Sequence, residues 1–467
     1  MLTFFRAKSL FHVFSIFVVL ALLKIPSIFN TLPVLNTELE WMLIGQRLNS
    51  DKSLYSQIWT AVGPLSAYFY GFVHFVFGRG QLFYEIMAFI LVFLQSLLFT
   101  RIINNNKVFI ERNYLPGLMY VIVMSMSFDV NKLSPSLMAT TFLLMAINSL
   151  FRHIDNGNRT SERIFEIGLF IGIGSLFYHP FPVYVLWALL SLIMFTPVKL
   201  NQILLLLLGF AMPIAIMFLF FYLAGTLDSF YEMWLLNTFR VNYFKGKDLI
   251  QNVLIYGIPL VLSVFGIIKV FGNIRYTSFQ NRKHQIFVLS GVFGLIAFFF
   301  SENTATYQLL CLSPFLAFFL TAWFIHLKGG LLPEMIFLAF LASVILINNL
   351  GISSGGYNAL EAMRIEKTTD KSYIIGKSIL ITGNKNDDYY QAKCGSVFVN
   401  WSISSADLSN PNVYESLLSI YESFKIEQPE YIIDNEIVFP AIFERIPELA
   451  SKYERVAGTR HYRLKGI

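Results

Sequence analysis

The sequence predicts an α-helical polytopic membrane protein with about eleven transmembrane helices, external juxtamembrane helices and a small C-terminal α/β domain outside the membrane. Three observations predict this fold class. The 467 residues are 55% hydrophobic and only 14% charged, with a mean hydropathy of +0.59, whereas soluble chains carry about 25% charged residues. Long apolar runs recur along the first three quarters of the chain. The last quarter, residues 351–467, holds 15 of the 29 acidic residues and is therefore expected in water.

This composition excludes a cytosolic enzyme, a nucleic-acid-binding protein and a disordered scaffold, and it makes membrane lipids necessary partners. The two cysteines, Cys311 in an apolar run and Cys394 in the polar tail, indicate neither a disulfide framework nor a metal cluster. The sequence contains no His/Cys metal spacing, P-loop, nucleophile elbow or internal repeat. It therefore predicts no certain cofactor, and it carries no information on a divalent metal.

Residues 10–30 form the first expected span. Arg6 and Lys8 precede it as in a signal peptide, but no small-residue cleavage site follows and Lys24 interrupts the run, so we expect the segment to be retained. A helix rises about 1.5 Å per residue and the hydrocarbon core is about 30 Å thick, which sets the length of a span. The further expected spans are 81–100, 114–128, 134–151, 164–178, 181–196, 201–223, 251–271, 286–300, 306–325 and 331–349.

Residues 62–78 decide the topology. This segment contains Gly63, Pro64 and His74, and as a helix it would reach only about 25 Å. If it lies in the interface and the N-terminus is cytoplasmic, six short cytoplasmic segments hold 13 Lys and Arg residues, against seven on the other side. The positive-inside rule favours this arrangement. We therefore expect a multi-pass inner-membrane protein with a transmembrane domain at 1–350 and a periplasmic α/β domain at 351–467.

This topology concentrates the external mass of the membrane domain in residues 31–80 and 224–250. Within the first of these loops, a polar start at Thr37 followed by apolar residues from Trp41 to Leu48 predicts a surface helix. Residues 62–78 form a second, aromatic-rich surface helix. An amphipathic external loop of this kind indicates a site at the membrane surface.

The tail has the alternating pattern of a small α/β domain. The segments "SILITG", "SVFVN" and "EYIID" are expected to be strands, and residues 412–426 an amphipathic helix. Gly383 precedes "NKNDDYY", but the glycine spacing and Lys-Ser/Thr of a P-loop are missing, so we expect a plain turn there.

The first external loop resembles that of the GT-C class of polytopic glycosyltransferases. In the stretch "LNTELEWMLIGQRLNSDKSLYSQIWTAVGPLSAYFYGFVHFVFGRG", Leu54-Tyr55, Gly63-Pro64-Leu65 and Phe77-Gly78 match the polar turn, the Pro-led aromatic helix and the Phe-Gly that precedes the second span in that class. The resemblance continues as a pattern in "YQLLCLSP", from Tyr307 to Pro314, and in a small external domain after the last span. Within that class, the chain resembles mannosyltransferases and arabinosyltransferases that depend on polyprenyl-phosphate sugars.

The resemblance implies transfer of a hexose or pentose from a polyprenyl-phosphate carrier to a glycan or envelope-protein acceptor, with inversion, on the external face. In the class, an external carboxylate acts as general base. The class places an acidic pair near Asn36-Thr37, whereas the carboxylates here are Glu38 and Glu40, and a shift of two residues turns a side chain by about 200° round a helix. A non-catalytic relative that binds lipid-linked glycan or a partner protein is the alternative. A transporter is disfavoured because few ionisable residues interrupt the spans.

The resemblance implies two catalytic candidates, Glu38 and Asp129, and one acidic substrate-binding candidate, Glu40. Each has a structural alternative. Glu38 favours the dipole at the start of a helix. Glu40 has the spacing of a capping box with Thr37. Asp129, in "SFDVNKLSPS", fits the second external carboxylate of the class, but it also fits a cap or a side chain facing water.

The remaining substrate-binding candidates are His179, Arg240, Lys245 and Tyr307. His179, in "FYHPF", is placed to contact a donor phosphate or to anchor the chain at the interface. Arg240 and Lys245 lie among aromatic residues in the 224–250 loop, where they fit either a polyprenyl phosphate or an aromatic belt with basic side chains attracted to anionic lipids.

Overall fold

The computed structural model describes residues 2–6, 11–29, 34–155, 161–236, 246–272, 276–327, 330–353, 365 and 372–466. The chain divides into two compact units, which we name the helical unit and the mixed unit. The helical unit comprises Met1–Leu32, Leu82–Leu219 and Thr238–Ala362, and the mixed unit comprises Pro33–Gln81, Phe220–Asn237 and Met363–Ile467.

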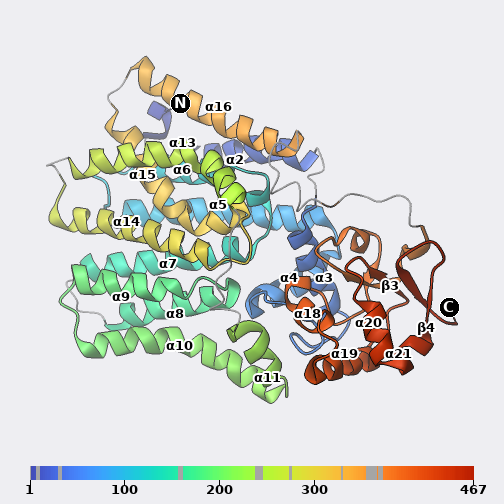
Figure 1. Cartoon of the computed structure of the whole chain (residues 1–467). Coiled ribbons are helices and arrows are strands. Elements are labelled where there is room, and N and C mark those ends of the chain that lie inside the picture. Colours follow the sequence, from blue (N-terminus) through green and yellow to red (C-terminus); the bar gives the residue numbers. More distant parts are fainter. Residues whose placement is uncertain are drawn as a thin grey trace. The chain divides into compact units, whose positions relative to one another are not determined.

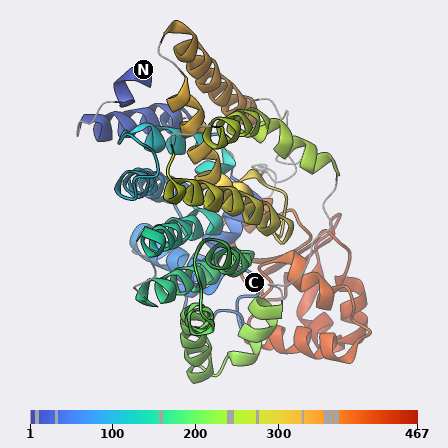
Figure 2. The same ribbon diagram turned by 90° about the vertical axis from the view of Figure 1, so that its left-hand side faces the viewer.

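Helices that run roughly parallel build the core of the helical unit; they are seen from the side in Figure 1 and many nearly end-on in Figure 2. Its elements are α1 (Leu2–Arg6), α2 (Phe11–Phe29), α5 (Gln81–Asn105), α6 (Leu115–Val123), η1 (Asp129–Asn131), α7 (Pro135–Asp155), α8 (Ser161–Phe177), α9 (Val183–Phe195), α10 (Leu200–Leu223), α13 (Gly246–Phe271), α14 (Ser278–Phe299), η3 (Thr306–Leu312), α15 (Ser313–His326) and α16 (Leu331–Ser353).

Each expected span contains a helix, but their lengths differ. Among the described residues, six helices are long and apolar enough to cross a membrane: Gln81–Asn105, Pro135–Asp155, Leu200–Leu223, Asn252–Phe271, Thr306–His326 and Leu331–Asn348. The expected span at 114–128 is helical only over Leu115–Val123, nine residues that reach about 14 Å. A multi-pass helical fold is therefore present, and the count of eleven spans stays a prediction.

Polar contacts at one end of the helical unit join segments that the positive-inside rule places together on the cytoplasmic side. Arg6 donates from Nη2 to the carbonyl oxygen of Phe324 (2.7 Å). Lys283 pairs with Asp155 (2.6 Å) and donates to the carbonyl oxygen of Asn106 (2.6 Å). Two more bonds extend the network, from Arg282 Nη1 to the carbonyl of Phe195 (3.1 Å) and from Tyr114 N to that of Phe5 (3.0 Å). These contacts link the described parts of segments expected to be cytoplasmic.

Small residues let α8 approach α10. A Cβ added at Gly168 would overlap the carbonyl oxygen of Leu206, and one at Gly172 would overlap that of Phe210. Gly209 of α10 lies equally close to the backbone of α8. The Gly168-x-x-x-Gly172 spacing is the one that allows membrane helices to pack backbone against backbone.

The mixed unit contains a five-stranded sheet of order β2-β1-β3-β5-β4. β1 is parallel to both β2 and β3, while β5 is antiparallel to β3 and β4; Ile379 lies opposite Tyr431, and Ile432 opposite Tyr462. The strands are β1 (Ser378–Thr382), β2 (Lys393–Cys394), β3 (Tyr431–Asp434), β4 (Tyr453–Arg455) and β5 (His461–Leu464).

Helices and short helical turns complete the mixed unit. They are α3 (Asn36–Leu48), α4 (Pro64–Phe77), α11 (Leu227–Phe230), η2 (Tyr231–Leu235), η4 (Ser372–Ile374), η5 (Asp387–Tyr390), α18 (Trp401–Leu408), α19 (Tyr414–Ile426), α20 (Phe439–Arg445) and α21 (Pro447–Lys452). The two expected loop helices and the 412–426 helix are thus present as α3, α4 and α19. α3 and α4 pack closely, with the Trp41 and Tyr70 rings stacked at 5.7 Å.

The expected strand "SVFVN" at 396–400 is wrong. Val397 and Phe398 are buried, as the pattern predicts, but the segment forms no strand. Its backbone bonds instead to the first loop, because Trp59 N donates to the carbonyl of Val397 (2.8 Å) and Asn400 N donates to that of Trp59 (3.2 Å). A two-residue strand, Lys393–Cys394, occupies the sheet edge.

The first external loop packs with the tail inside the mixed unit. Arg47, only 3% exposed, donates to the carbonyl of Cys394 (2.9 Å) and pairs with Glu427 (2.7 Å). Arg79 donates to the carbonyl of Ala392 (2.9 Å). By packing, the tail is therefore part of a larger unit that includes residues 33–81, while a membrane boundary at residue 350 stays a prediction.

Candidate functional site

The start of α3 carries three polar side chains, of which Glu38 is buried and Asn36 and Thr37 are half-buried. Asn36, Thr37 and Glu38 occupy its first turn, and Glu38 is 1% exposed. Asn36 Oδ1 and Thr37 Oγ1 are buried and have no hydrogen-bond partner among the described residues. Buried polar atoms are normally paired, and each unpaired one costs about 1–3 kcal/mol. This turn, where the GT-C resemblance places an acidic pair, therefore holds two acceptor oxygens that no described residue pairs.

The capping box considered for Thr37 and Glu40 is not formed. The helix begins two residues earlier than that pattern requires, with Leu35 as the residue before its first turn. Glu38 then occupies the third helical position, and its Oε2 accepts a long hydrogen bond from Leu35 N (3.5 Å). The capping partner is therefore Glu38, and Glu40 is available for other contacts.

Glu40 connects the first loop to the tail within the mixed unit. Its Oε1 accepts hydrogen bonds from Thr60 Oγ1 (3.1 Å) and from Asn400 Nδ2 (2.9 Å). Asn400 is itself the cap of α18 through its bond from Ser402 N (2.9 Å). Glu40 therefore has a structural role in this arrangement, and substrate binding by Glu40 stays a prediction.

In the helical unit, Asp129 holds the η3 segment. It is fully buried; its Oδ2 accepts from Tyr307 N (3.0 Å), and its Oδ1 accepts from the hydroxyl of Thr306. Burial raises the pKa of Asp129, while these two bonds lower it. The structure thus brings together two residues that the sequence analysis selected separately, Asp129 and Tyr307.

The η3 segment is fixed by side chains from several helices. Its carbonyl groups accept from Ser136 Oγ at Tyr307 (2.7 Å) and from Tyr184 Oη at Cys311 (3.1 Å). Asn252 Nδ2 donates to the carbonyl of Thr304 just before η3 (2.7 Å). Helices α7, α9 and α13 therefore hold Tyr307 and Asp129 in one rigid arrangement.

A buried charged group near Asp129 was not selected from the sequence. Lys132, fully buried, pairs with Glu85 at 2.9 Å, and Glu85 also interacts electrostatically with Lys24 of α2, which is 2% exposed. One carboxylate, Glu85, thus interacts with two buried lysines of the helical unit. The sequence signal was the ionisable residue inside an apolar run, Lys24, which the sequence analysis used only to argue against cleavage.

His179 is buried between α8 and α9. Burial lowers the pKa of its imidazole to about 4, so the side chain is neutral at pH 7. A neutral imidazole contacts a phosphate only through an N–H group, without a formal charge. A contact between His179 and the donor phosphate stays a prediction, with the imidazole as an uncharged hydrogen-bond donor.

Two predicted site residues, Arg240 and Lys245, lie outside the described residues. The part of their loop that is described is aromatic: Phe230 stacks on Phe221 at 4.4 Å and on Trp234 at 5.1 Å. Within the described part of the chain, no group of three or more His, Cys, Asp or Glu side chains is arranged to hold a metal ion.

Comparison with solved structures shows the fold of the chain to be similar to that of ArnT. ArnT from Cupriavidus metallidurans, solved with bound undecaprenyl phosphate, matches with a TM-score of 0.54 at 11% identity, covering 98% of this chain and 98% of ArnT. The oligosaccharyltransferase AglB from Archaeoglobus fulgidus, in complex with an inhibitory peptide and a dolichol-phosphate, gives a TM-score of 0.49 at 13% identity, covering 98% of this chain and 74% of AglB. No protein-family model and no curated protein sequence matches the chain.

The chain thus has the fold of the GT-C class of membrane glycosyltransferases, the class that its first external loop resembles. This confirms the predicted class at the level of the fold. The mostly helical architecture with a small C-terminal sheet agrees with that assignment.

Proposed function

We propose that the chain is a membrane glycosyltransferase that moves a sugar from a polyprenyl-phosphate carrier to an acceptor on the external face of the inner membrane. The observation that carries this proposal is the first turn of α3, which holds the buried carboxylate of Glu38 and buried oxygen atoms of Asn36 and Thr37 without partners among the described residues. Sugar hydroxyls donate and accept hydrogen bonds, so a sugar or a hydroxyl-bearing acceptor would satisfy these atoms.

Glu38 is the proposed general base. The acceptor hydroxyl oxygen attacks the anomeric carbon while its proton passes to the Glu38 carboxylate. The bond from the anomeric carbon to the phosphate oxygen breaks, and polyprenyl phosphate leaves with the electron pair. A single displacement of this kind inverts the anomeric centre.

The proposed donor is a polyprenyl-phosphate sugar. The solved ArnT structure, which shares this fold, contains undecaprenyl phosphate, a ligand of the same chemistry. Asp129 is proposed to position Tyr307 and η3, since both of its oxygens already accept hydrogen bonds there.

One observation favours the non-catalytic alternative, a GT-C-like scaffold that binds lipid-linked glycan or a partner protein. Asn36 and Thr37 stand where the class has acids, and the Glu38 carboxylate bonds back to Leu35. An asparagine and a threonine bind hydroxyl groups but do not accept a proton at neutral pH.

Two substitutions distinguish a catalytic glycosyltransferase from a non-catalytic scaffold. Glu38→Gln should lower the release of polyprenyl phosphate from a panel of polyprenyl-phosphate hexoses and pentoses by about 10²–10⁴-fold, since a general base contributes that much. Glu40→Gln is the matched control and should change the rate by less than tenfold, because Gln Oε1 still accepts from Thr60 and Asn400. Both variants should fold and insert like the wild type.

Two outcomes would change the assignment. Full activity in Glu38→Gln would show that the base is another residue. A wild type that binds these lipids without releasing polyprenyl phosphate, in the presence of candidate acceptors, would establish the non-catalytic scaffold.

A further inference from the structure

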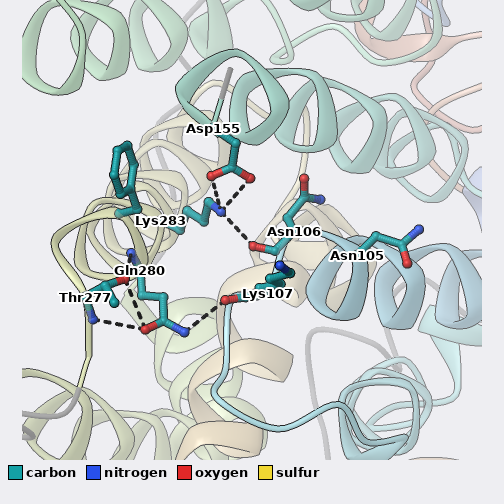
Figure 3. A pocket seen from close by; sticks show the side chains of 8 residues that line it. Asn105, Asn106, Lys107, Asp155, Thr277, Gln280 and Lys283 are labelled. Carbon is teal, nitrogen blue, oxygen red and sulfur yellow. Dashed lines mark hydrogen bonds and ion pairs between the residues drawn. The ribbon is translucent and has the colours of Figure 1, made fainter. Parts of the chain in front are cut away.

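A polar pocket lies at the end of the helical unit away from Asp129 and η3. It has a volume of about 490 Å³, which is within the range of about 300–1,000 Å³ typical of small-molecule sites. Figure 3 shows that the ends of α5 and α7 and the start of α14 build it. Its lining residues are Asn105, Asn106, Lys107, Asp155, Thr277, Phe279, Gln280 and Lys283.

The frame of the pocket is held by its own hydrogen bonds. Lys283 lies between Asp155 and the carbonyl of Asn106, with its Nζ 2.6 Å and 2.8 Å from the two carboxylate oxygens (Figure 3). Gln280 Nε2 donates to the carbonyl of Lys107 (3.0 Å), while Gln280 Oε1 accepts from Thr277 N (3.0 Å). These bonds tie the three helix ends together around the pocket.

The charges of the pocket do not balance. Lys283 and Asp155 neutralise each other, because both oxygens of Asp155 contact the ammonium group. The second lysine, Lys107, has no ion-pair or side-chain hydrogen-bond partner among the described residues, and the side-chain amide of Asn105 has none there either. Lys107 is also close enough to Lys283 for their positive charges to repel. An anion between them would relieve this repulsion.

The backbone at Lys107 adds an independent observation. Lys107 follows the end of α5 with a φ of 48°, in the left-handed region where glycine or asparagine is the usual residue. Strained positions of this kind tend to occur at functional sites. The lysine places its ammonium group at the pocket although its backbone is strained there. Glycine would adopt the same backbone conformation without strain.

We propose that this pocket binds a phosphate group, carried by an anionic phospholipid headgroup or by a free phosphate compound. The Lys107 ammonium group supplies hydrogen-bond donors to its oxygens. The site is separate from the proposed transfer site, and it requires no glycosyltransferase activity. If the charge-based topology is right, the pocket lies at the headgroup level of the cytoplasmic leaflet.

Binding to the purified full chain in neutral detergent tests the proposal. Native mass spectrometry with phosphatidylglycerol and phosphatidylcholine, and calorimetry with inorganic phosphate, provide the two arms. Lys107→Gln should weaken binding of the anionic probe by about tenfold or more, the usual loss for one charge-assisted hydrogen bond. Lys199→Gln, which removes an exposed lysine outside the pocket, is the matched control and should bind like the wild type.

A second variant separates ligand binding from folding. Lys107→Gly should be at least as stable as the wild type, because glycine adopts this backbone conformation without strain, yet it should lose binding as Lys107→Gln does. Loss of phosphatidylglycerol alone identifies a lipid headgroup as the source, and loss of inorganic phosphate binding identifies a free phosphate.

Three results would overturn the proposal. They are a wild type that binds neither anionic probe, Lys107 variants that both bind like the wild type, and a Lys199→Gln variant that loses as much affinity as Lys107→Gln. The last result would show a diffuse surface attraction instead of a pocket.

Discussion

Buried carboxylates in this chain are held by hydrogen bonds from segments far away in the sequence. Glu40 accepts from Asn400, 360 residues later, and Asp129 accepts from Tyr307, 178 residues later. A buried acceptor that loses its donors, or a donor that loses its acceptor, costs more than the bond itself contributes. Replacing the carboxylate of Glu40 or Asp129 should therefore change the stability of the fold measurably.

Glu40→Leu should lower the free energy of unfolding by about 1–3 kcal/mol, because Thr60 and Asn400 would keep their buried donors without an acceptor. Glu40→Gln retains one acceptor oxygen and should lose much less. Thermal unfolding in detergent, followed by intrinsic fluorescence, compares the two. Equal midpoints for the Leu and Gln variants would contradict the structural role of Glu40.

His179 gives stability a defined pH dependence. Its pKa is about 4 in the folded chain against an ordinary value near 6.5, so the unfolded chain binds more protons between these values. Its contribution is complete above about pH 6.5 and is lost as the pH falls towards 4, at up to about 1.4 kcal/mol per pH unit. His179→Gln should therefore show a smaller drop in unfolding midpoint between pH 7.5 and pH 5 than the wild type. Identical drops would mean that His179 is not buried in its neutral form.

At the scale of elements, glycines set how closely α8 and α10 approach. Gly168→Ala would place a Cβ into the carbonyl oxygen of Leu206, and backbone cannot yield as a flexible side chain does. We expect a loss of about 1–3 kcal/mol in stability. Gly257→Ala in α13 is the matched control, since a Cβ there meets nothing within 4 Å and alanine favours helix. A Gly168→Ala protein as stable as the control would argue against this close crossing.

Elements defined by local periodicity were predictable, and elements defined by distant partners were not. The apolar runs located the long helices, and turn residues located α3, α4 and α19. The segment 396–400 has the alternation of a strand, yet its backbone bonds to Trp59, which no local pattern indicates. The same limit applies to the site: the sequence selected Glu38, Asp129 and Tyr307, but it did not show that Lys24 and Lys132 share Glu85.

For the whole molecule, the basic residues predict which ends of the helices face the cytoplasm. Contacts such as Lys283 to Asp155 link segments of the expected cytoplasmic group, and those of Asp129 to Thr306 and Tyr307 lie in the opposite group. A reporter fused after residue 105 should therefore respond as cytoplasmic, and one fused after residue 360 as periplasmic. Both reporters on the same side would contradict the predicted topology.

The mixed unit is built from three stretches of chain that are made at very different times. The α3 turn leaves the ribosome early, whereas Asn400, the partner of Glu40, is added 360 residues later. At about 5–20 residues per second, the delay is on the order of 20–70 s. During that time α3 exists without the tail contacts that complete its surroundings. A chain that stops before the tail would therefore carry every residue of the α3 turn and still lack the Asn400 contact to Glu40, so that full-length synthesis itself becomes a condition for the proposed activity.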